Sequence, residues 1–445
     1  MEVWAVNQQD YRNFSYFFIP FSLRNQDCFN DFVQDIEESG CWKTVREKLT
    51  YMFRFVADKL SCTDPEDRRV VHYYLDEKDP RVQTMELVNR WFCTTPLAYR
   101  GEKTGFRFLL RDVQLFAFST GVCILAIRVR FDSSDPYRVA AAQYYLKKVS
   151  NRIVLPEGST EKTSILELSK RTMSGLIEEY GMDFFFYANE DTERANFLTF
   201  LEVPTQESYT RELFFLKWAY HDQFNYCEAA DDAAKENYVA SDDVVWGITS
   251  SAAVCLTCPD RGRGGFLRGM FVRNFQEQYL FIYAFLLHQK YVMYMFLTRI
   301  GVGMKNDQAM LERYKKELYE FETDFIFSHV TEVPQYQRLY ERIERAFALK
   351  EMFRDVHEPI RSLAEMRNRA AEEEQNEYDS RMNQALNTLS WLTVVTALLD
   401  IVGVSDGVEK LLGEDATLWI QGIGFALVAG ISLNFAIRML RNRKK

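Results

Sequence analysis

Asp400 is the residue whose position most directly suggests chemistry, because it lies within a mostly apolar run, residues 385–404. A carboxylate inside a membrane-spanning helix costs roughly 3 kcal/mol and usually faces water or a partner. At helical spacing Asp400 shares one stripe with five other residues, and we predict that this stripe lines a pore: Asn383, Leu386, Leu389, Thr393, Thr396 and Asp400. The alternative is that Asp400, one turn from the end of the run, reaches the membrane interface.

A second candidate site is the basic, glycine-rich segment of residues 261–268 (RGRGGFLR). Backbone amides and guanidinium groups in such a loop can hold a phosphate. Arg261, Arg263 and Arg268 are therefore candidate ligand-binding residues. The segment lacks the Lys-Ser/Thr ending of a P-loop, and a solvated linker is the more common meaning of this composition.

No residue pattern predicts a catalytic centre. Cys255 and Cys258 form a single C-x-x-C without a second pair, which indicates two buried thiols rather than a zinc site. The five histidines form no H-E-x-x-H cluster, and no G-x-S-x-G occurs. An acidic stretch, residues 372–379, could bind divalent ions between subunits but more often indicates a solvated helix face. We therefore predict that the chain is not an enzyme.

Two apolar runs, residues 385–404 (ALNTLSWLTVVTALLDIVGV) and 418–437 (LWIQGIGFALVAGISLNFAI), are long enough to cross a bilayer. At about 1.5 Å per residue, each matches a hydrocarbon core of about 30 Å. The linker between them is acidic, whereas the tail, residues 438–445, is basic. Basic flanks stay inside, so we predict a multi-pass protein of the cell inner membrane with both termini cytoplasmic. A pair of buried helices in a soluble core is the alternative.

A third apolar segment, residues 279–300, carries His288, Gln289 and Lys290 at its midpoint. These polar groups would cost several kcal/mol at the centre of a bilayer. A helix inside a folded domain can instead give them hydrogen-bond partners. We therefore predict a core helix here.

The composition limits the expected partners. A net charge of -10 argues against general nucleic-acid binding, because phosphate contacts need a basic face, although a local basic patch could bind a small anionic ligand. The first residues show neither a secretory signal nor a transit pattern. Eight cysteines scattered over 445 residues favour reduced thiols in a reducing compartment. We expect the lipid bilayer and a small ligand as partners.

The remaining segments predict an α+β cytoplasmic domain followed by long stalk helices and two C-terminal transmembrane helices. Residues 3–20, 107–118 and 123–132 have strand character, with a turn at 119–121, and residues 30–38, 136–148 and 164–180 have helix character. A linker at residues 155–163 divides this region. Two charged helices, residues 307–329 and 335–357, precede a stalk that begins near Pro359 and runs into the first span as one helix of about 45 residues, or about 70 Å. We predict four parts: an α/β domain (1–270), a helical and stalk region (271–384), a transmembrane hairpin (385–437) and a basic tail (438–445).

This order of elements, with residues 378–389 (YDSRMNQALNTL) leading into the membrane, resembles the CorA magnesium transporter superfamily. The similarity covers about the last 110 residues and is only architectural before them. The resemblance implies a homo-oligomer, a pentamer in that family, in which the first spans line the pore. One departure concerns magnesium: the family's Gly-Met-Asn signature at the outer end of the first span is missing, and Gly403-Val404-Ser405-Asp406 stands there.

CorA-like proteins without this signature occur among the membrane effectors of type III CRISPR systems, in antiviral defence. Residues 245–251 (VWGITSS), followed by His288-Gln289-Lys290-Tyr291, resemble that branch. The resemblance implies a nucleotide messenger as activating ligand, a conjugate of S-adenosyl methionine and AMP, and adds Trp246, Thr249 and Ser250 to the candidate ligand-binding residues. The alternative is a divalent cation transporter that carries magnesium. A membrane-anchored enzyme is a third possibility, without any supporting motif.

Overall fold

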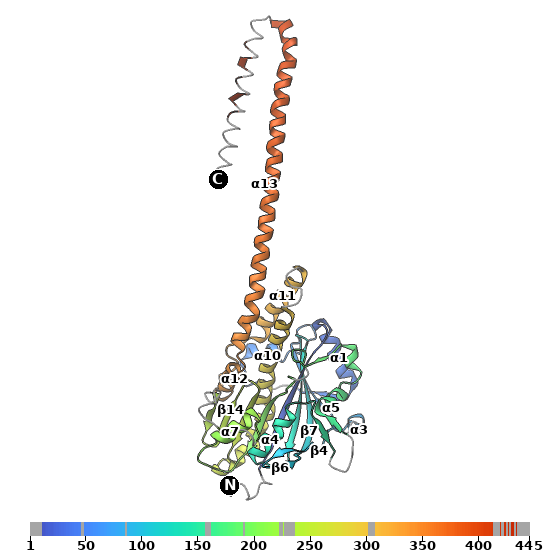
Figure 1. Cartoon of the computed structure of the whole chain (residues 1–445), viewed down its shortest axis with the longest axis vertical. Helices are drawn as coiled ribbons and strands as arrows, with labels where there is room; N and C mark the ends of the chain where they lie inside the picture. Colours follow the sequence, from blue (N-terminus) through green and yellow to red (C-terminus); the bar gives the residue numbers. More distant parts are fainter. Residues whose placement is uncertain are drawn as a thin grey trace. The chain divides into compact units, whose positions relative to one another are not determined.

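Figure 1 shows the computed structural model, which describes residues 11–45, 49–84, 87–155, 162–189, 192–221, 226, 236–300 and 308–412, with residues 419, 422, 423, 426, 429, 430 and 433. The chain forms two compact units, Met1–Ile360 and Arg361–Lys445. The first unit is a mixed α+β domain, and a long helical region follows it. Most of the second predicted span, residues 418–437, and the whole basic tail lie outside the described residues.

The described residues of the first unit build one large sheet of 13 strands in the order β10-β9-β4-β7-β8-β1-β12-β15-β14-β13, in which β3 also pairs with β7, β2 with β3, and β11 with β1. A separate hairpin is formed by β5 and β6. The strands are β1 (Asn13–Ser22), β2 (Trp42–Thr44), β3 (Val70–Leu75), β4 (Arg90–Thr94), β5 (Leu97–Tyr99), β6 (Glu102–Thr104), β7 (Arg107–Phe118), β8 (Val122–Phe131), β9 (Arg152–Val154), β10 (Lys162–Ser164), β11 (Asp183–Phe184), β12 (Asn196–Glu202), β13 (Tyr238–Ser241), β14 (Val244–Ile248) and β15 (Ala252–Thr257).

The α-helices of the structure are α1 (Phe29–Ser39), α2 (Arg54–Leu60), α3 (Pro80–Thr84), α4 (Pro136–Leu146), α5 (Ile165–Thr172), α6 (Leu176–Glu179), α7 (Thr210–Trp218), α8 (Gly264–Phe266), α9 (Val272–Asn274), α10 (Leu280–Ile300), α11 (Gln308–Phe325), α12 (Pro334–Ala346) and α13 (Leu349–Leu412). Two short 3-10 turns, η3 (Gln26–Cys28) and η6 (Pro259–Arg261), and two π-helical turns, η7 (Leu267–Phe271) and η8 (Phe275–Tyr279), complete them.

The hairpin of β7 and β8 at the centre of the sheet confirms the strands predicted at residues 107–118 and 123–132. Gly121 takes a positive φ of 79° in the turn between them, a conformation that costs glycine little. Residues 3–10 of the first predicted strand lie outside the described residues, and β1 runs from Asn13 to Ser22, two residues past the predicted end. The predicted linker at residues 155–163 does not divide the domain, because β9, just before it, pairs in the same sheet with β10, which begins inside it at Lys162.

Side chains alternate between the two faces of a sheet along each strand. On the central strands β1 and β8 most side chains of both faces are buried. On β1, Phe17, Ile19 and Phe21 join a hydrophobic core with residues of α1, α4, α5 and α7. Phe14 and Phe18 point to the other face, where Phe14 contacts Phe275 and Phe18 contacts Tyr283 of α10, with ring centroids 5.6 and 5.0 Å apart. The predicted helices at residues 30–38 and 136–148 are confirmed as α1 and α4. The helix predicted at 164–180 is split into α5 and α6 at Gly175, whose φ is 95°.

Helix α10 confirms the core helix predicted at residues 279–300. The helical stretch Gly264–Ile300 is long and apolar enough to cross a membrane, but 89% of its apolar window is buried inside the fold. The three polar residues at its midpoint all have partners. His288 Nε2 lies 2.8 Å from Thr120 Oγ1, Gln289 Nε2 donates to the Phe325 carbonyl at 2.7 Å, and Lys290 Nζ donates to the Ser250 carbonyl at 2.6 Å.

Helix α13 corrects the predicted stalk. Residues 349–412 form one helix, so the stalk and the first predicted span are continuous, as expected, but the helix starts ten residues before Pro359. The charged helix predicted at residues 335–357 therefore ends early, with α12, at Ala346. Ala348, with a φ of 54°, separates α12 from α13. The start of the predicted outer linker, residues 405–412, is also helical.

Candidate functional site

The six residues of the predicted pore stripe all lie on α13. Five of them, Asn383, Leu386, Leu389, Thr393 and Thr396, have exposed side chains. The side chain of Asp400 lies outside the described part of the structure, although its backbone is helical. Thr393 and Thr396 donate hydrogen bonds to carbonyls one turn earlier, at 2.9 and 2.8 Å, so their hydroxyls add little polarity to the helix surface.

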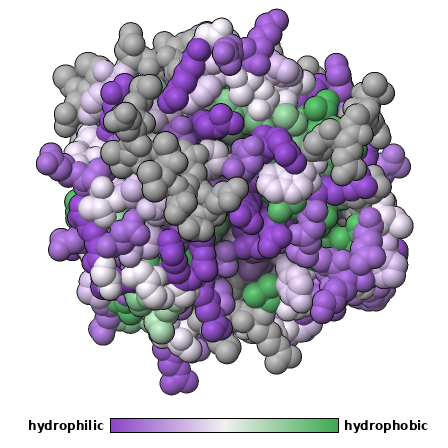
Figure 2. Space-filling model, turned by 90° about the horizontal axis from the view of Figure 1, so that it is seen from below, coloured by the Kyte–Doolittle hydropathy of each residue, from purple (hydrophilic) through white to green (hydrophobic). Residues whose placement is uncertain are grey.

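The same part of α13 exposes large apolar side chains. Leu386, Leu389 and Leu392 are 55%, 61% and 63% exposed, and Trp391 is also exposed. The described residues of the chain do not cover this surface. By contrast, hydrophilic side chains dominate the face of the molecule in Figure 2, where hydrophobic ones form small separate patches. Large exposed apolar surfaces of this kind often mark interaction sites.

Residues 245–251, one part of the predicted ligand site, form β14 and its turn into β15. Trp246 is buried, with its ring centroid 5.8 Å from that of Phe275. Thr249 is buried as well, and its Oγ1 accepts hydrogen bonds from the Ser251 and Ala252 amides at 3.3 and 3.1 Å. The carbonyl of Ser250 accepts from Lys290. These contacts give Trp246, Thr249 and Ser250 roles in packing the fold.

The three predicted arginines also have partners within the chain. Arg261 donates to the Gln206 carbonyl at 2.9 Å, and Arg263 Nε donates to Asp243 Oδ2 at 2.7 Å. Arg268 Nε lies 3.3 Å from Oε2 of the buried Glu202. The loop is therefore attached to the ends of β12 and β14. None of the six predicted ligand residues lines either of the two pockets described next.

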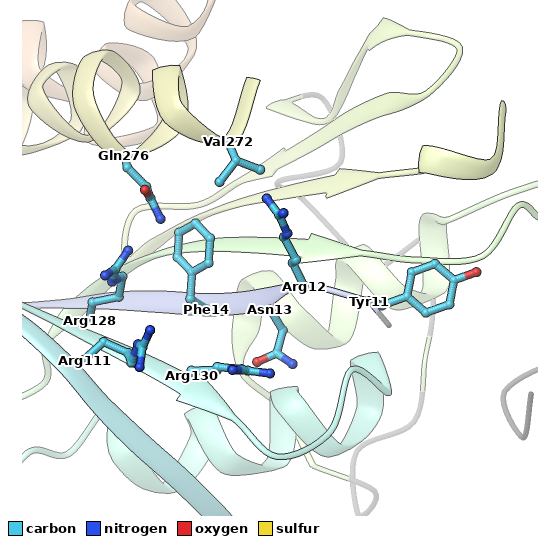
Figure 3. A pocket seen from close by; sticks show the side chains of 9 residues that line it. All are labelled: Tyr11, Arg12, Asn13, Phe14, Arg111, Arg128, Arg130, Val272 and Gln276. Atoms are coloured by element: carbon cyan, nitrogen blue, oxygen red, sulfur yellow. The ribbon is translucent and has the colours of Figure 1, made fainter. Parts of the chain in front are cut away.

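The structure instead brings four other arginines together in a pocket of about 370 Å³ at one end of the sheet. We call it the arginine pocket. In Figure 3 the arginines are grouped around Phe14, and Val272 and Gln276 approach from the helical segment on the other side. The described lining residues are Tyr11, Arg12, Asn13, Phe14, Arg111, Arg128, Arg130, Val272 and Gln276. They include four guanidinium groups and no carboxylate.

A β-bulge in β7 places both Arg111 and Asp112 on this face of the sheet. Leu110 of β7 pairs with Val129, but Asp112 pairs with Arg128, so Arg111 is an extra residue in the ladder. The alternation of β7 changes phase at this point, with Leu110 and then Val113 in the hydrophobic core. Bulges re-aim side chains in this way and are frequent near functional sites.

The four arginines differ in how far the protein neutralises them. Arg128 forms an ion pair with Asp112 and lies 5.9 Å from the centre of the Phe14 ring. Arg12 Nη1 donates to the Arg268 carbonyl, and Arg111 Nη1 donates to Asn89 Oδ1 at 3.2 Å, so both keep their full charge. Arg130 is exposed, with no hydrogen-bond or ion-pair partner among the residues that the structure describes.

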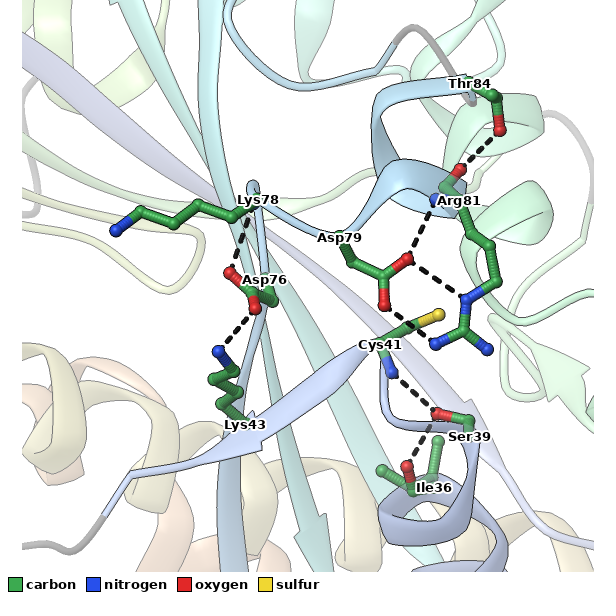
Figure 4. A network of polar contacts seen from close by, with 9 residues as sticks. All are labelled: Ile36, Ser39, Cys41, Lys43, Asp76, Lys78, Asp79, Arg81 and Thr84. Atoms are coloured by element: carbon green, nitrogen blue, oxygen red, sulfur yellow. Dashed lines mark hydrogen bonds and ion pairs between the residues drawn. The ribbon is translucent and has the colours of Figure 1, made fainter.

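A neighbouring pocket of about 500 Å³ shares Arg128 and Gln276 with the arginine pocket but has mixed charges. Its lining carries charged side chains of both signs, and Figure 4 shows one pair, Lys43 Nζ and Asp76 Oδ2, which lie 2.5 Å apart. The bond from Lys43, followed by that from the Lys78 amide, lowers the pKa of Asp76. The excess positive charge is therefore confined to the arginine pocket.

The described part of the structure offers no comparable metal site. Its described residues contain no group of three His, Cys, Asp or Glu side chains suited to a metal ion. Cys255 and Cys258 are buried thiols, as predicted, and burial raises the pKa of both. Cys258 Sγ lies 2.6 Å from the Tyr209 hydroxyl.

Sequence reasoning missed the arginine pocket because its members come from separate strands and a helical segment. One local signal was present. The apolar residues of β7 alternate up to Leu110 and resume out of phase at Val113, which indicates a bulge at Arg111 and Asp112.

Comparison of the chain with protein families, curated proteins and solved structures finds no match.

Proposed function

We propose that the chain is a CorA-like membrane protein that assembles as a homo-oligomer around a pore, which opens or disrupts the bilayer when a small ligand binds the α+β unit. By resemblance, the ligand is a nucleotide messenger, a conjugate of S-adenosyl methionine and AMP, and the setting is type III CRISPR antiviral defence. The second predicted span completes the membrane hairpin in this proposal.

The exposed apolar side chains of α13 are the observation that carries the membrane part of the proposal. Burial of apolar surface contributes roughly 25 cal/mol per Å², so leaving Leu386, Leu389, Trp391 and Leu392 in water is unfavourable. A bilayer or neighbouring copies of α13 would cover them. The charge-rich stretch of the same helix before residue 382 suits water, which supports a helix that passes from solvent into lipid.

One feature of the α+β unit supports a sensing role. It holds a pocket with an excess of positive charge, which a small anionic ligand would complement. The divalent cation transporter is the second candidate. Exposed Glu372, Glu373 and Glu374 on α13 favour it, because symmetry would bring several copies together. The missing Gly-Met-Asn signature speaks against magnesium as the transported ion.

A flux assay on the full chain distinguishes these functions. The protein is reconstituted into liposomes that contain a fluorescent dye, and the conjugate of S-adenosyl methionine and AMP is added outside. The proposal predicts dye or ion release that depends on this ligand, with none from protein-free liposomes. Ligand-independent magnesium uptake would instead support the transporter, and impermeable liposomes under both conditions would contradict a pore.

A further inference from the structure

We infer that the arginine pocket binds the phosphate group of a small soluble ligand. The biological role of this site rests on the proposed function, in which a small ligand acts on the α+β unit. Its chemistry rests on the lining of the pocket alone. The residues that carry it, Arg12, Arg111, Arg128 and Arg130, differ from the ligand residues predicted from the sequence.

The charge of the pocket favours an anion. Asp112 offsets only one of the four guanidinium groups, and the partners of Arg12 and Arg111 are a carbonyl and an amide oxygen, which leave the charge in place. The guanidinium group of Arg130 donates no hydrogen bond to any residue that the structure describes. Guanidinium groups form paired, charge-assisted hydrogen bonds with phosphate oxygens. Such a cluster is most easily explained by a phosphate, in a chain whose net charge is -10.

The size of the pocket and its apolar parts favour a nucleotide-sized ligand. A volume of about 370 Å³ is within the range of small-molecule sites. Phe14 and Val272 give it an apolar side, and the Gln276 amide offers a donor and an acceptor. The adjoining pocket, lined by Asp76, Glu77 and Asp112 among others, leaves room for a second, uncharged or cationic part of the ligand.

The pocket is also connected, through η8, to the helix that precedes the long helix α13. Gln276 belongs to the π-helical turn η8, a rare geometry that often marks functional sites. In the same turn, Gln278 Oε1 accepts a hydrogen bond from the Tyr336 hydroxyl of α12. The Tyr279 and Tyr336 ring centroids lie 4.9 Å apart. Because α12 is followed directly by α13, a ligand that moves Gln276 acts on the helix that precedes the stalk.

Binding measurements on the detergent-solubilised full chain test the inference. The probes are AMP, inorganic phosphate and vesicles that contain phosphatidylserine, each titrated against the parent chain, Arg111→Gln and Arg130→Gln. Both arginines are exposed, so the variants should fold. We expect saturable AMP binding that weakens with salt and becomes at least about tenfold weaker in each variant. Arg54→Gln, an exposed arginine of α2 outside the pocket, is the charge-matched control and should bind AMP like the parent.

Three results would overturn the inference: no saturable AMP or phosphate binding at millimolar concentration, equal affinity in the parent and both variants, or binding of the anionic vesicles alone. The last result would assign the arginines to a lipid headgroup. Failure of the proposed function would give a different result. AMP binding that depends on Arg111 and Arg130, together with no ligand-dependent flux, would support the phosphate site and contradict the gated pore.

Discussion

Replacement of Lys290 by methionine should change how the stability of the α+β unit depends on pH. Lys290 is buried in α10, and burial lowers its pKa from 10.5 to about 8. Between these values the unfolded chain keeps the proton that the folded chain releases, so the free energy of unfolding rises with pH across this window. Below pH 8 Lys290 is charged in the folded chain, and its burial lowers the free energy of unfolding by about 3 kcal/mol. This figure is the pKa difference multiplied by 1.36 kcal/mol per pKa unit.

The expected size of the change follows from this window. Methionine has no proton to lose, so the stability difference between Lys290→Met and the parent should move by about 2 kcal/mol between about pH 7 and pH 9.5. The lost hydrogen bond to the Ser250 carbonyl adds an offset at both pH values. The shift in the thermal midpoint is this free-energy change divided by the entropy of unfolding, which scales with the number of residues. For the unit Met1–Ile360, 2 kcal/mol corresponds to a shift of about 3 °C.

Thermal unfolding of the full chain in detergent, followed by tryptophan fluorescence, measures this shift. The control is Lys316→Met, which changes an exposed lysine of α11 and should leave the pH dependence of the parent unchanged. A midpoint difference for Lys290→Met that is equal at both pH values would refute the reasoning. It would mean that Lys290 is solvated, and that α10 is not the buried helix of the structure.

Four further predictions concern the membrane part and its control. Tags at both ends of the chain should be cytoplasmic and Ser405→Cys should label from outside, because the tail is basic and the linker acidic; an externally accessible C-terminus would reverse the orientation. Asp400→Asn should lower cation flux in ligand-activated liposomes more than Asp406→Asn does, because a ring of Asp400 carboxylates would attract cations; equal flux in the parent chain and Asp400→Asn would place Asp400 at the lipid interface. Expression should not rescue a magnesium-uptake mutant, since the Gly-Met-Asn signature is missing, and robust rescue would restore the transporter. Tyr336→Phe removes the hydrogen bond to Gln278 and should reduce ligand-dependent flux while AMP binding stays unchanged; full flux would exclude this contact as a route from pocket to stalk.

Local sequence patterns predicted the parts of the fold that depend on local physics. The β7–β8 hairpin followed from alternating apolar residues around a glycine turn, and α1 and α4 followed from helical periodicity. The buried position of α10 followed from the cost of placing His288, Gln289 and Lys290 in lipid. The long continuous helix was expected because neither Gly nor Pro interrupts its middle.

Features that depend on contacts distant in sequence could not be predicted in this way. The start of α13 was misplaced because Pro359, which lies inside the helix, was taken as its first turn, whereas the break between helices occurs at Ala348. The arginine pocket requires the pairing of β1, β7 and β8 and the position of η8, none of which is encoded in a short segment. From its composition the loop at residues 261–268 was either a solvated linker or a phosphate loop, whereas its arginines bond to Asp243, Glu202 and the Gln206 carbonyl.

Extraction of membranes from cells that express the full chain tests the central claim, that residues 385–404 and 418–437 cross the bilayer. Washing with alkaline carbonate removes proteins that are bound only to the membrane surface, whereas spanning helices remain because their apolar side chains stay in the lipid. The account predicts that the chain remains in the membrane pellet and is released only by detergent. Recovery of the chain in the carbonate supernatant would contradict it.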